Sequence, residues 1–509
     1  MKKKNQSPKL GLYYIFFLLF LLTAQPTFGI QIDTPTIVAG TAKLTGRITI
    51  PKGIKKDSIF VKITVPHPIS GELVKYAVIA DSSGKFLIDA DVEATISFIH
   101  FSTTLNPAKS LLIKLKSEEV TNLNITYNSD FEIEKINITP LMKQNDITQF
   151  HNLMGKMIMH IPAKPVEPLY NKSIDYFLSY NKTYLSDYLL IANNDTLISE
   201  ELKSTLYNEF RLFFYKGAMF DYGIAMGANF SQINDNKNEK PVIQNIDKSY
   251  YRFLKDFKLN DPKYLHASTF LEFQAKILQN EILAIPKIEE TDIPTWLTNV
   301  KSILADLVGF NEGQYYDMLT ANAYGLQLTE EVRPLSEKQK ENIKNYWGNG
   351  EIAKILFRKN KEVTELDKFK SPVVINDVST VEPEKIIETI VSKHKGKVIL
   401  IDLWATWCGP CLEAMQRFRP VKAELHGKDI VFVYLTNRSS DRKLWEEKIK
   451  GIGSQHYYLD DKQWEYIMTK FEFEYIPSYL LYDKKGTLSN KFSAFPENEE
   501  VKAMINGLL

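Results

Sequence analysis

Two cysteines set three positions apart are the residues of this sequence best suited to chemistry. Cys408 and Cys411 are the only cysteines among 509 residues, with Gly409 and Pro410 between them and Trp407 before them. This Cys-x-x-Cys spacing places two sulfurs one helical turn apart, so that one can attack a disulfide while the other closes an internal one. A structural zinc site needs four ligands, and no histidine lies within ten residues on either side. The pair therefore predicts redox chemistry in preference to metal binding or an inert pair.

Composition excludes several other classes of function. Lys plus Arg (63) nearly equals Asp plus Glu (62), so no global field favours nucleic acid, and we expect no nucleic-acid partner. The eight histidines are scattered and predict no metal site. No glycine loop suited to cradling phosphate occurs, so we expect no cofactor apart from a redox-active disulfide between Cys408 and Cys411.

The segment 1–29 has the pattern of a cleavable secretory signal peptide. Four lysines within the first nine residues precede an apolar run at 10–24, and small residues occupy the positions that a signal peptidase reads. A spanning helix needs roughly 20 apolar residues, so an uncleaved anchor is the weaker alternative. We therefore expect export, where a lone cysteine pair cannot mispair with other cysteines of its own chain.

Two patterns divide the next 330 residues or so. Residues 30–140 hold short runs rich in Ile, Val, Thr and Phe, separated by turns such as 81–84, and predict an all-β, sandwich-like domain. Residues 141–360 change to apolar residues at three- and four-residue spacings, for example over 200–214 and 269–285, and predict an α-helical domain. Its many aromatic residues could form a ligand-binding stripe, although core packing is the simpler interpretation. Ser336 and Gln339 have the spacing of a capping box at the start of a helix.

Strands and helices alternate in the last segment, 370–509. The near-continuous apolar run at 397–404 predicts a strand buried on both faces. A helix is expected from Gly409, a second buried strand at 430–436, and a hairpin over 478–492 before a terminal helix. This order predicts an α/β domain with a mixed central sheet, and a multidomain chain as a whole.

The stretch from Asp402 to Cys411, Asp-Leu-Trp-Ala-Thr-Trp-Cys-Gly-Pro-Cys, resembles the active-site segment of thioredoxins. It is most similar to the TlpA-like branch, which comprises exported thiol-disulfide oxidoreductases of the bacterial envelope. Ile476 and Pro477 fall where this family places its cis-proline loop. The resemblance covers 370–509, about a quarter of the chain. It implies a thioredoxin-like fold, a periplasmic or cell-envelope location, protein disulfides as substrates, and an upstream electron donor such as a membrane thiol reductase.

The resemblance also implies roles for the two cysteines and for the acid before them. Cys408 is expected to be an exposed nucleophile at a helix N-terminus, where the helix dipole stabilises a thiolate. Cys411, deeper in the helix, is expected to be the resolving thiol. Asp402 is costly to bury on an apolar strand, and we expect it to accept the proton of Cys411; the alternative is a strand-end acid that reaches solvent.

Further residues are expected to shape the site. Trp404 and Ile476 are expected to contribute to substrate docking. Trp407, part of the active-site motif, is expected to pack around the site and shape its surface. Pro477, if its peptide bond is cis, would hold the preceding backbone beside the sulfurs; an ordinary trans turn is the alternative. Gly409 and Pro410 form the pair found in reducing thioredoxins, which favours electron donation.

The sequence departs from the TlpA-like branch at two positions, and both put the fine tuning of the thiol pKa in doubt. That branch usually has a glutamate three residues after the second cysteine, and Ala414 stands there. It usually has a proline five residues after that cysteine, and Gln416 stands there. Glu413 is interpreted as a solvated charge on the helix face.

Two hypotheses follow. In the first, the chain is an exported thiol-disulfide oxidoreductase that reduces protein disulfides through Cys408 and Cys411. In the second, it is a binding or assembly module of the cell envelope, in which the thioredoxin-like part is mainly a scaffold. Peroxide reduction is less consistent with the sequence, because the threonine-containing loop before a single peroxidatic cysteine is missing.

Overall fold

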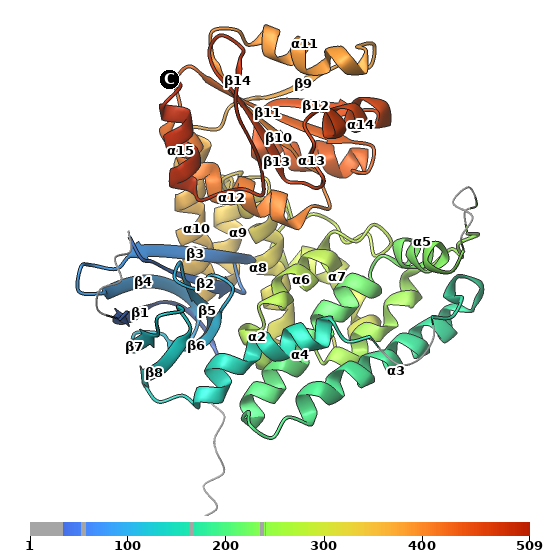
Figure 1. Cartoon of the computed structure of the whole chain (residues 1–509). Coiled ribbons are helices and arrows are strands. Elements are labelled where there is room, and N and C mark those ends of the chain that lie inside the picture. The colour runs from blue at the N-terminus through green and yellow to red at the C-terminus, as the bar shows by residue number, and fades with distance from the viewer. Residues whose placement is uncertain (1–33, 52–57, 162–165, 235–238, 240) are drawn as a thin grey trace, which may run out of the picture. The chain divides into compact units, whose positions relative to one another are not determined.

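A computed structural model describes residues 34–51, 58–161, 166–234, 239 and 241–509 (Figure 1). Pro35–Leu509 forms one compact unit. The predicted signal peptide at 1–29 lies outside the described residues. Within the described ranges, every helix is too short or too polar to pass through a bilayer.

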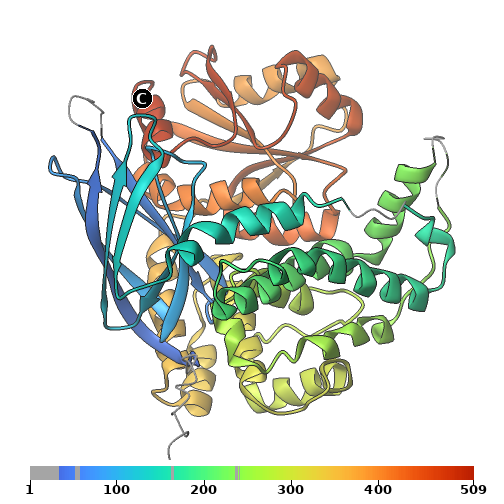
Figure 2. The same cartoon turned by 60° about the horizontal axis from the view of Figure 1, so that its bottom comes forward.

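The N-terminal region is rich in sheet, as predicted, and consists of two four-stranded sheets. In spatial order the first sheet contains β4 (Lys85–Ala94), β1 (Ile37–Thr49), β7 (Val120–Tyr127) and β8 (Ile133–Thr139). The second contains β3 (Glu72–Ile79), β2 (Phe60–His67), β5 (Ile96–Thr103) and β6 (Leu111–Lys116). Strands β1 and β7 are parallel, and the other neighbours are antiparallel. Alternate residues of both sheets share one apolar core, so the sheets pack face to face (Figure 2).

The predicted turn at 81–84 connects β3 to β4. The carboxylate of Asp81 accepts backbone N–H groups of Ser83 at 2.8 Å and Lys85 at 2.9 Å. Gly84 has φ +78°, which glycine adopts without steric cost. Local chemistry alone therefore determines this turn, which explains why the sequence revealed it.

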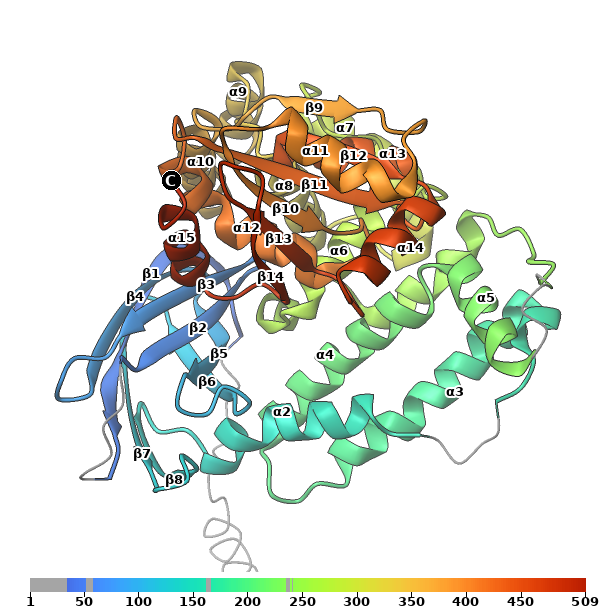
Figure 3. The same cartoon turned by 45° about the horizontal axis from the view of Figure 1, so that its top comes forward.

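The middle of the chain is helical, as predicted. Its α-helices are α2 (Gln144–Ile158), α3 (Ile174–Asn193), α4 (Glu200–Ala218), α5 (Tyr222–Ile233), α6 (Thr269–Leu278), α7 (Ile293–Val308), α8 (Gln314–Thr329), α9 (Glu337–Trp347) and α10 (Glu351–Asp367). In the described parts of this region, 3₁₀ helices lie between them: η1 (Leu169–Asn171), η2 (Lys248–Phe257) and η3 (Pro262–His266). Helices α3 and α4 lie side by side (Figure 3). Many of the aromatic side chains are buried in one core, which supports the packing interpretation; examples are Phe210, Tyr250, Phe273 and Trp296.

The helical pattern at 269–285 is interrupted in the structure, because α6 ends at Leu278. The side chain of Asn280 accepts the backbone N–H groups of Ile282 at 3.0 Å and Leu283 at 2.9 Å. An asparagine that bonds to the backbone just ahead of it favours a turn over a continuing helix. Leu283 and Ile285 beyond Asn280 are still buried, so the apolar spacing indicated burial and not helix.

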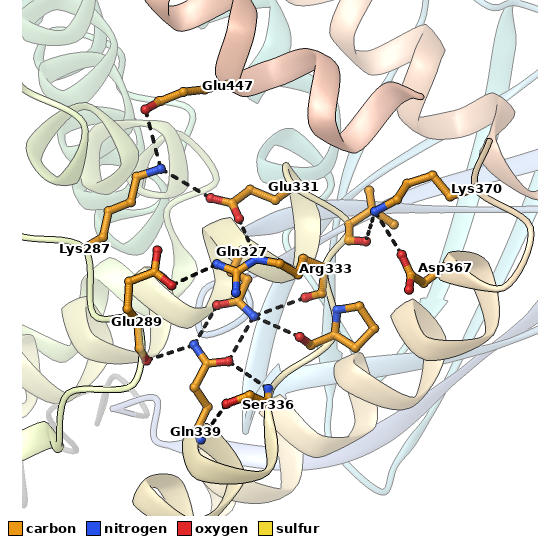
Figure 4. A network of polar contacts seen from close by, with 12 residues as sticks. Lys287, Glu289, Gln327, Glu331, Arg333, Ser336, Gln339, Asp367, Lys370 and Glu447 are labelled. Atoms are coloured by element: carbon orange, nitrogen blue, oxygen red, sulfur yellow. Dashed lines mark hydrogen bonds and ion pairs between the residues drawn. The ribbon is translucent and has the colours of Figure 1, made fainter. Parts of the chain in front are cut away.

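The predicted capping box at Ser336 and Gln339 begins α9 (Figure 4). Gln339 donates its backbone N–H to Ser336 Oγ at 3.2 Å and accepts the Ser336 N–H at 2.9 Å. Its side-chain amide also exchanges hydrogen bonds with Gln327 of α8, at 2.7 and 3.0 Å. The cap therefore also joins α8 to α9.

The C-terminal region contains a six-stranded sheet, in the order β14-β13-β10-β11-β12-β9. Its strands are β9 (Val373–Asn376), β10 (Val398–Leu403), β11 (Ile430–Asn437), β12 (Ser454–Leu459), β13 (Ser478–Tyr482) and β14 (Leu488–Ser493). Strand β10 pairs parallel with β11 and antiparallel with β13, so the sheet is mixed, as predicted. The helices are α11 (Ile386–Lys393), α12 (Gly409–Glu424), α13 (Arg442–Ile452), α14 (Asp461–Lys470) and α15 (Asn498–Asn506), with η4 (Pro383–Lys385) before α11.

Helices cover both faces of this sheet, so both sets of alternate residues on β10 are buried (Figure 1). Leu400 and Trp404 belong to the core that contains residues of α12, α13 and α15. Ile399 and Leu403 belong to the core on the α11 and α14 side. By strand alternation Asp402 lies on the α12 side, with Leu400 and Trp404.

Gly451 of α13 lies directly against the end of α8. A Cβ at this position would lie 1.8 Å from the carbonyl oxygen of Glu330. We expect Gly451→Ala to lower the free energy of unfolding by about 1–3 kcal/mol, because α13 must move away from that backbone. Gly217→Ala is the control, since that helical glycine of α4 has no atom within 4 Å of its added Cβ. It should leave the protein unchanged or stabilise it by up to about 1 kcal/mol. Urea unfolding measures the free energy of unfolding of both variants. Equal changes in the two variants would contradict the prediction.

Candidate functional site

The two cysteines lie at the beginning of α12 and are joined as a disulfide. Cys408 is the N-cap residue, and its sulfur accepts the backbone N–H of Cys411 at 3.2 Å. Pro410 lies in the first turn, where its missing N–H removes no helical hydrogen bond. The free N–H groups and the dipole of a helix N-terminus stabilise negative charge, so after reduction this geometry favours a thiolate at Cys408.

Exposure differs between the two cysteines less than the sequence suggested. Cys411 is fully buried, but Cys408, expected to be exposed, is also only 3% exposed in the disulfide form. Its side chain belongs to the apolar cluster of Trp404 and Ala405. The accessible surface next to the disulfide is instead provided by Trp407, which is 63% exposed. The indole N–H of Trp407 donates to Ser439 Oγ at 3.0 Å, a partner that the sequence gave no reason to expect.

Trp404, assigned to substrate docking, is fully buried in the structure. It follows β10 on the α12 side of the sheet and packs in the core with Cys408 and Cys411. The docking assignment is therefore wrong for Trp404, because its side chain cannot meet a partner from solvent. Both faces of β10 are covered, so the apolar pattern could not show which tryptophan reaches the surface.

The peptide bond between Ile476 and Pro477 is cis. Ser478, the first residue of β13, lies directly opposite Leu403, the last residue of β10. Pro477 therefore lies at the same end of the sheet as the loop that leads from β10 to the cysteines. Ile476 packs against the cluster that contains both cysteines. Tyr475, which sequence reasoning did not single out, is 55% exposed beside this loop.

Asp402 is almost completely buried, at 6% exposure, so it is not a strand-end acid reaching solvent. In register it lies between Tyr434 of β11 and Tyr479 of β13. Burial raises the pKa of Asp402 well above its usual value, and the nearby cation of Lys422 opposes that rise in part. Among the described residues no hydrogen-bond partner contacts its Oδ1. A carboxyl group whose pKa is raised in this way binds a proton more strongly than an exposed carboxylate does.

Lys422 is a part of the site that sequence reasoning missed. It lies on the face of α12 that also carries Cys411, Met415 and Phe418, and its ammonium lies above the sheet near Asp402. The spacing of four, three and four residues was visible in the sequence and indicates an inward-facing position. A lysine so close to the end of a helix was easily taken for a surface residue.

Glu413 and Gln416 of α12 both contact strand β3. Gln416 is one of the two departures from the TlpA-like pattern; the other, Ala414, lines the cavity beside Asp402. Glu413, interpreted as a solvated charge, forms an ion pair with Lys75 of β3, although both side chains remain about half exposed. Gln416 donates to Glu72 Oε2 at 3.3 Å. These contacts connect the helix that carries the disulfide to the N-terminal sheets.

In the part of the chain that the structure describes, no group of three or more His, Cys, Asp or Glu side chains is arranged to hold a metal ion. His100 and His151 do approach each other, with Nδ1 and Nε2 2.8 Å apart. Burial lowers the pKa of each to about 4, so both are neutral near pH 7. They contact each other as a packed polar pair between β5 and α2.

Comparison with known proteins agrees with this geometry. Residues 396–488, which contain β10, α12, β11 and β13, match a family model described as thioredoxin-like. The C-terminal region is a thioredoxin-like domain. It carries the single Cys-x-x-Cys motif of the chain, and the β-rich and helical regions lie outside the matched residues.

Two curated relatives each match a minor part of the chain. A thioredoxin of Coprinus comatus is 31% identical over 70 residues, which are 14% of this chain and 66% of that protein. Thioredoxin Y2, chloroplastic, of Arabidopsis thaliana is 27% identical over 117 residues, 23% of this chain and 54% of that protein. The chain thus spans just under two thirds and about half of these curated relatives.

Among solved structures, a protein from Bacteroides vulgatus described as a thiol-disulfide oxidoreductase is 32% identical, with a TM-score of 0.20. The alignment covers 23% of this chain and 82% of that protein. StoA from Bacillus subtilis is 20% identical, with a TM-score of 0.19, and the alignment covers 21% of this chain and 82% of StoA.

Proposed function

We propose that this protein is an exported thiol-disulfide oxidoreductase of the TlpA-like branch that reduces disulfides of other proteins. The observation that carries the proposal is the Cys408–Cys411 disulfide at the N-terminus of α12, within a thioredoxin-like domain. A redox role follows from that motif and that fold together. Export is supported by the signal-like pattern of 1–29.

The reaction divides between the two sulfurs. The reduced Cys408 thiolate attacks one sulfur of a substrate disulfide, and the second substrate sulfur leaves with the bonding electron pair and takes up a proton. The Cys411 sulfur, after losing its proton, attacks Cys408 Sγ. The Cys408–Cys411 disulfide forms, and the bond between Cys408 and the substrate breaks. Two electrons have then passed from the protein to the substrate.

The direction of electron flow and the surface that meets the substrate are also proposals. Gly409-Pro410 between the cysteines supports electron donation. Trp407 and Tyr475, both exposed, flank the disulfide and the cis-proline loop and offer an aromatic surface to an incoming chain. An upstream donor, such as a membrane thiol reductase, would return the disulfide to the dithiol.

Reduction of insulin disulfides by the full chain tests this function. With dithiothreitol as electron donor, we expect the protein to accelerate precipitation of the insulin B chain well above the rate with dithiothreitol alone. A folded protein that leaves that rate unchanged would contradict the proposed activity.

A further inference from the structure

A partly buried lysine, Lys422, lies on the active-site helix at a position where the spacing of the preceding apolar residues predicts another apolar residue. Cys411, Met415 and Phe418 of α12 face the sheet, and Lys422 continues that face one turn later. Its Nζ donates to Tyr434 Oη and to the carbonyl oxygen of Ile452, each at 3.0 Å. It also lies 5.1 Å from the centres of the Phe432 and Tyr434 rings. Burying an ammonium group is costly even with such partners, so its presence here requires a reason.

The lysine and Asp402 line the same small cavity between α12 and the sheet, together with Tyr434, Tyr479 and Ala414. Asp402 Oδ1 and Tyr479 Oη, which belong to two facing residues of β10 and β13, have no hydrogen-bond partner among the described residues. The cavity thus brings a carboxyl group whose Oδ1 has no hydrogen-bond partner among the described residues close to a cation that Tyr434 holds in place. Ala414, where the TlpA-like branch usually has a glutamate, adds no second acid to it.

The other titratable groups around Lys422 each keep one protonation state near neutral pH. Burial raises the pKa of the Tyr434 and Tyr479 hydroxyls, so both stay protonated. Burial lowers the pKa of His456, which stacks on Tyr434, to about 4, so it is neutral. Arg419, one turn earlier on α12, stays charged and donates to the carbonyl oxygen of Thr329 at 2.7 Å. Burial lowers the pKa of Lys422 to about 7, with Arg419 adding to that effect. Lys422 and Asp402 are therefore the groups of this cluster whose charge can change during turnover.

We propose that Lys422 is a positioning residue for the thiol exchange: held by Tyr434, it supplies the nearby positive charge that lets Asp402 take the proton of Cys411. This inference rests on the proposed function and deepens it. When Cys411 attacks the mixed disulfide, its proton moves to the carboxylate of Asp402. The bond between Cys408 and the substrate breaks, and the substrate sulfur leaves with the electron pair. Without the cation, an ionised Asp402 is less stable in the cavity, so fewer molecules hold the base in its active form.

The substitution Lys422→Met, which keeps the length of the side chain and removes its charge, tests the proposal in the full chain. The pH at which single-turnover reduction of insulin is half-maximal should rise by about one unit, so that the rate at pH values well below this midpoint falls about tenfold. Tyr434→Phe, which removes one hydrogen bond of the lysine, should shift the profile in the same direction by less. Lys448→Met is the matched control, because Lys448 of α13 pairs with Glu330 outside this cavity. It should leave the profile unchanged.

A second measurement separates this inference from the proposed function. In a Cys408→Ser background, ultraviolet absorbance of the thiolate reports the pKa of Cys411 without any substrate. Adding Lys422→Met should raise that pKa by about one unit, whether or not the protein reduces insulin. An unchanged pKa of Cys411, or an activity loss of the same size at every pH, would overturn the proposal. If Lys422→Met fails to fold, Tyr434→Phe is judged by the same two outcomes.

Discussion

Replacing Cys408 by serine is expected to abolish disulfide reduction, with a fall of at least about 10³-fold in the insulin rate. The reason is that a serine hydroxyl at the N-terminus of α12 cannot form the mixed disulfide that begins the reaction. The fold should be retained, because oxygen replaces sulfur at an N-cap position where serine is a favoured residue. Insulin turbidity, with circular dichroism as the check on folding, measures the effect.

Replacing Cys411 by serine should have a different outcome, since Cys408 can still attack but its mixed disulfide can no longer be resolved. We expect the variant to accumulate covalent adducts with substrate proteins that disappear on reduction, and mass spectrometry can identify the captured chains. The variant with both cysteines replaced is the control and should capture none. Full biological activity of that double variant would favour the alternative of a binding or assembly module. Rapid alkylation of reduced Cys408 by iodoacetamide near pH 7 is the companion result, because a helix N-terminus lowers a thiol pKa.

The features that the sequence predicted well are those determined by neighbouring residues. The turn at Asp81–Gly84 depends on one carboxylate and one glycine, and the cap of α9 on Ser336 and Gln339. The position of Cys408 at a helix N-terminus likewise follows from the motif and the pattern after it. In each case the interacting groups lie within four residues of one another, so no knowledge of the tertiary structure was needed.

The features that the sequence did not predict depend on contacts between distant segments. The burial of Trp404 and the exposure of Trp407 are decided by helices on both faces of β10. The ion pair of Lys75 with Glu413 joins residues 338 positions apart. Lys422 was missed because its partners, Tyr434 and the Ile452 carbonyl, come from β11 and the end of α13. Tertiary packing, and not local propensity, gives each of these residues its role.

Asp402→Asn is expected to slow disulfide reduction by about 10²-fold near pH 7. Asparagine keeps the size and shape of the side chain in the cavity beside Tyr434 and Tyr479 but cannot accept a proton from Cys411. The wild-type rate should rise with pH as Asp402 ionises, whereas the residual rate of the variant should follow only the ionisation of the thiols. Single-turnover rates across the pH range distinguish the two profiles.

The same substitution should stabilise the protein, and the gain should grow with pH. Burial raises the pKa of Asp402 in the folded state, whereas the unfolded value is about 3.9. Between these two values the folded state binds more protons than the unfolded state, so wild-type stability falls as pH rises, by about 1.4 kcal/mol per pH unit. This loss of stability begins near the pKa of Asp402 in the unfolded state and ends near its pKa in the folded state. Asparagine does not titrate, so the free energy of unfolding of the variant lacks this slope.

Glu209→Gln is a matched control for both effects of Asp402→Asn. Burial also raises the pKa of Glu209, but its carboxylate accepts backbone N–H groups from Ser268 and Thr269. Glutamine cannot accept all of these hydrogen bonds, so this variant should lose stability while reducing insulin at the wild-type rate. Urea unfolding at several pH values, with insulin reduction on the same samples, separates an acid that serves the chemistry from one that serves the fold. An Asp402→Asn variant that is less stable than wild type, with an unchanged rate, would place Asp402 in the second group.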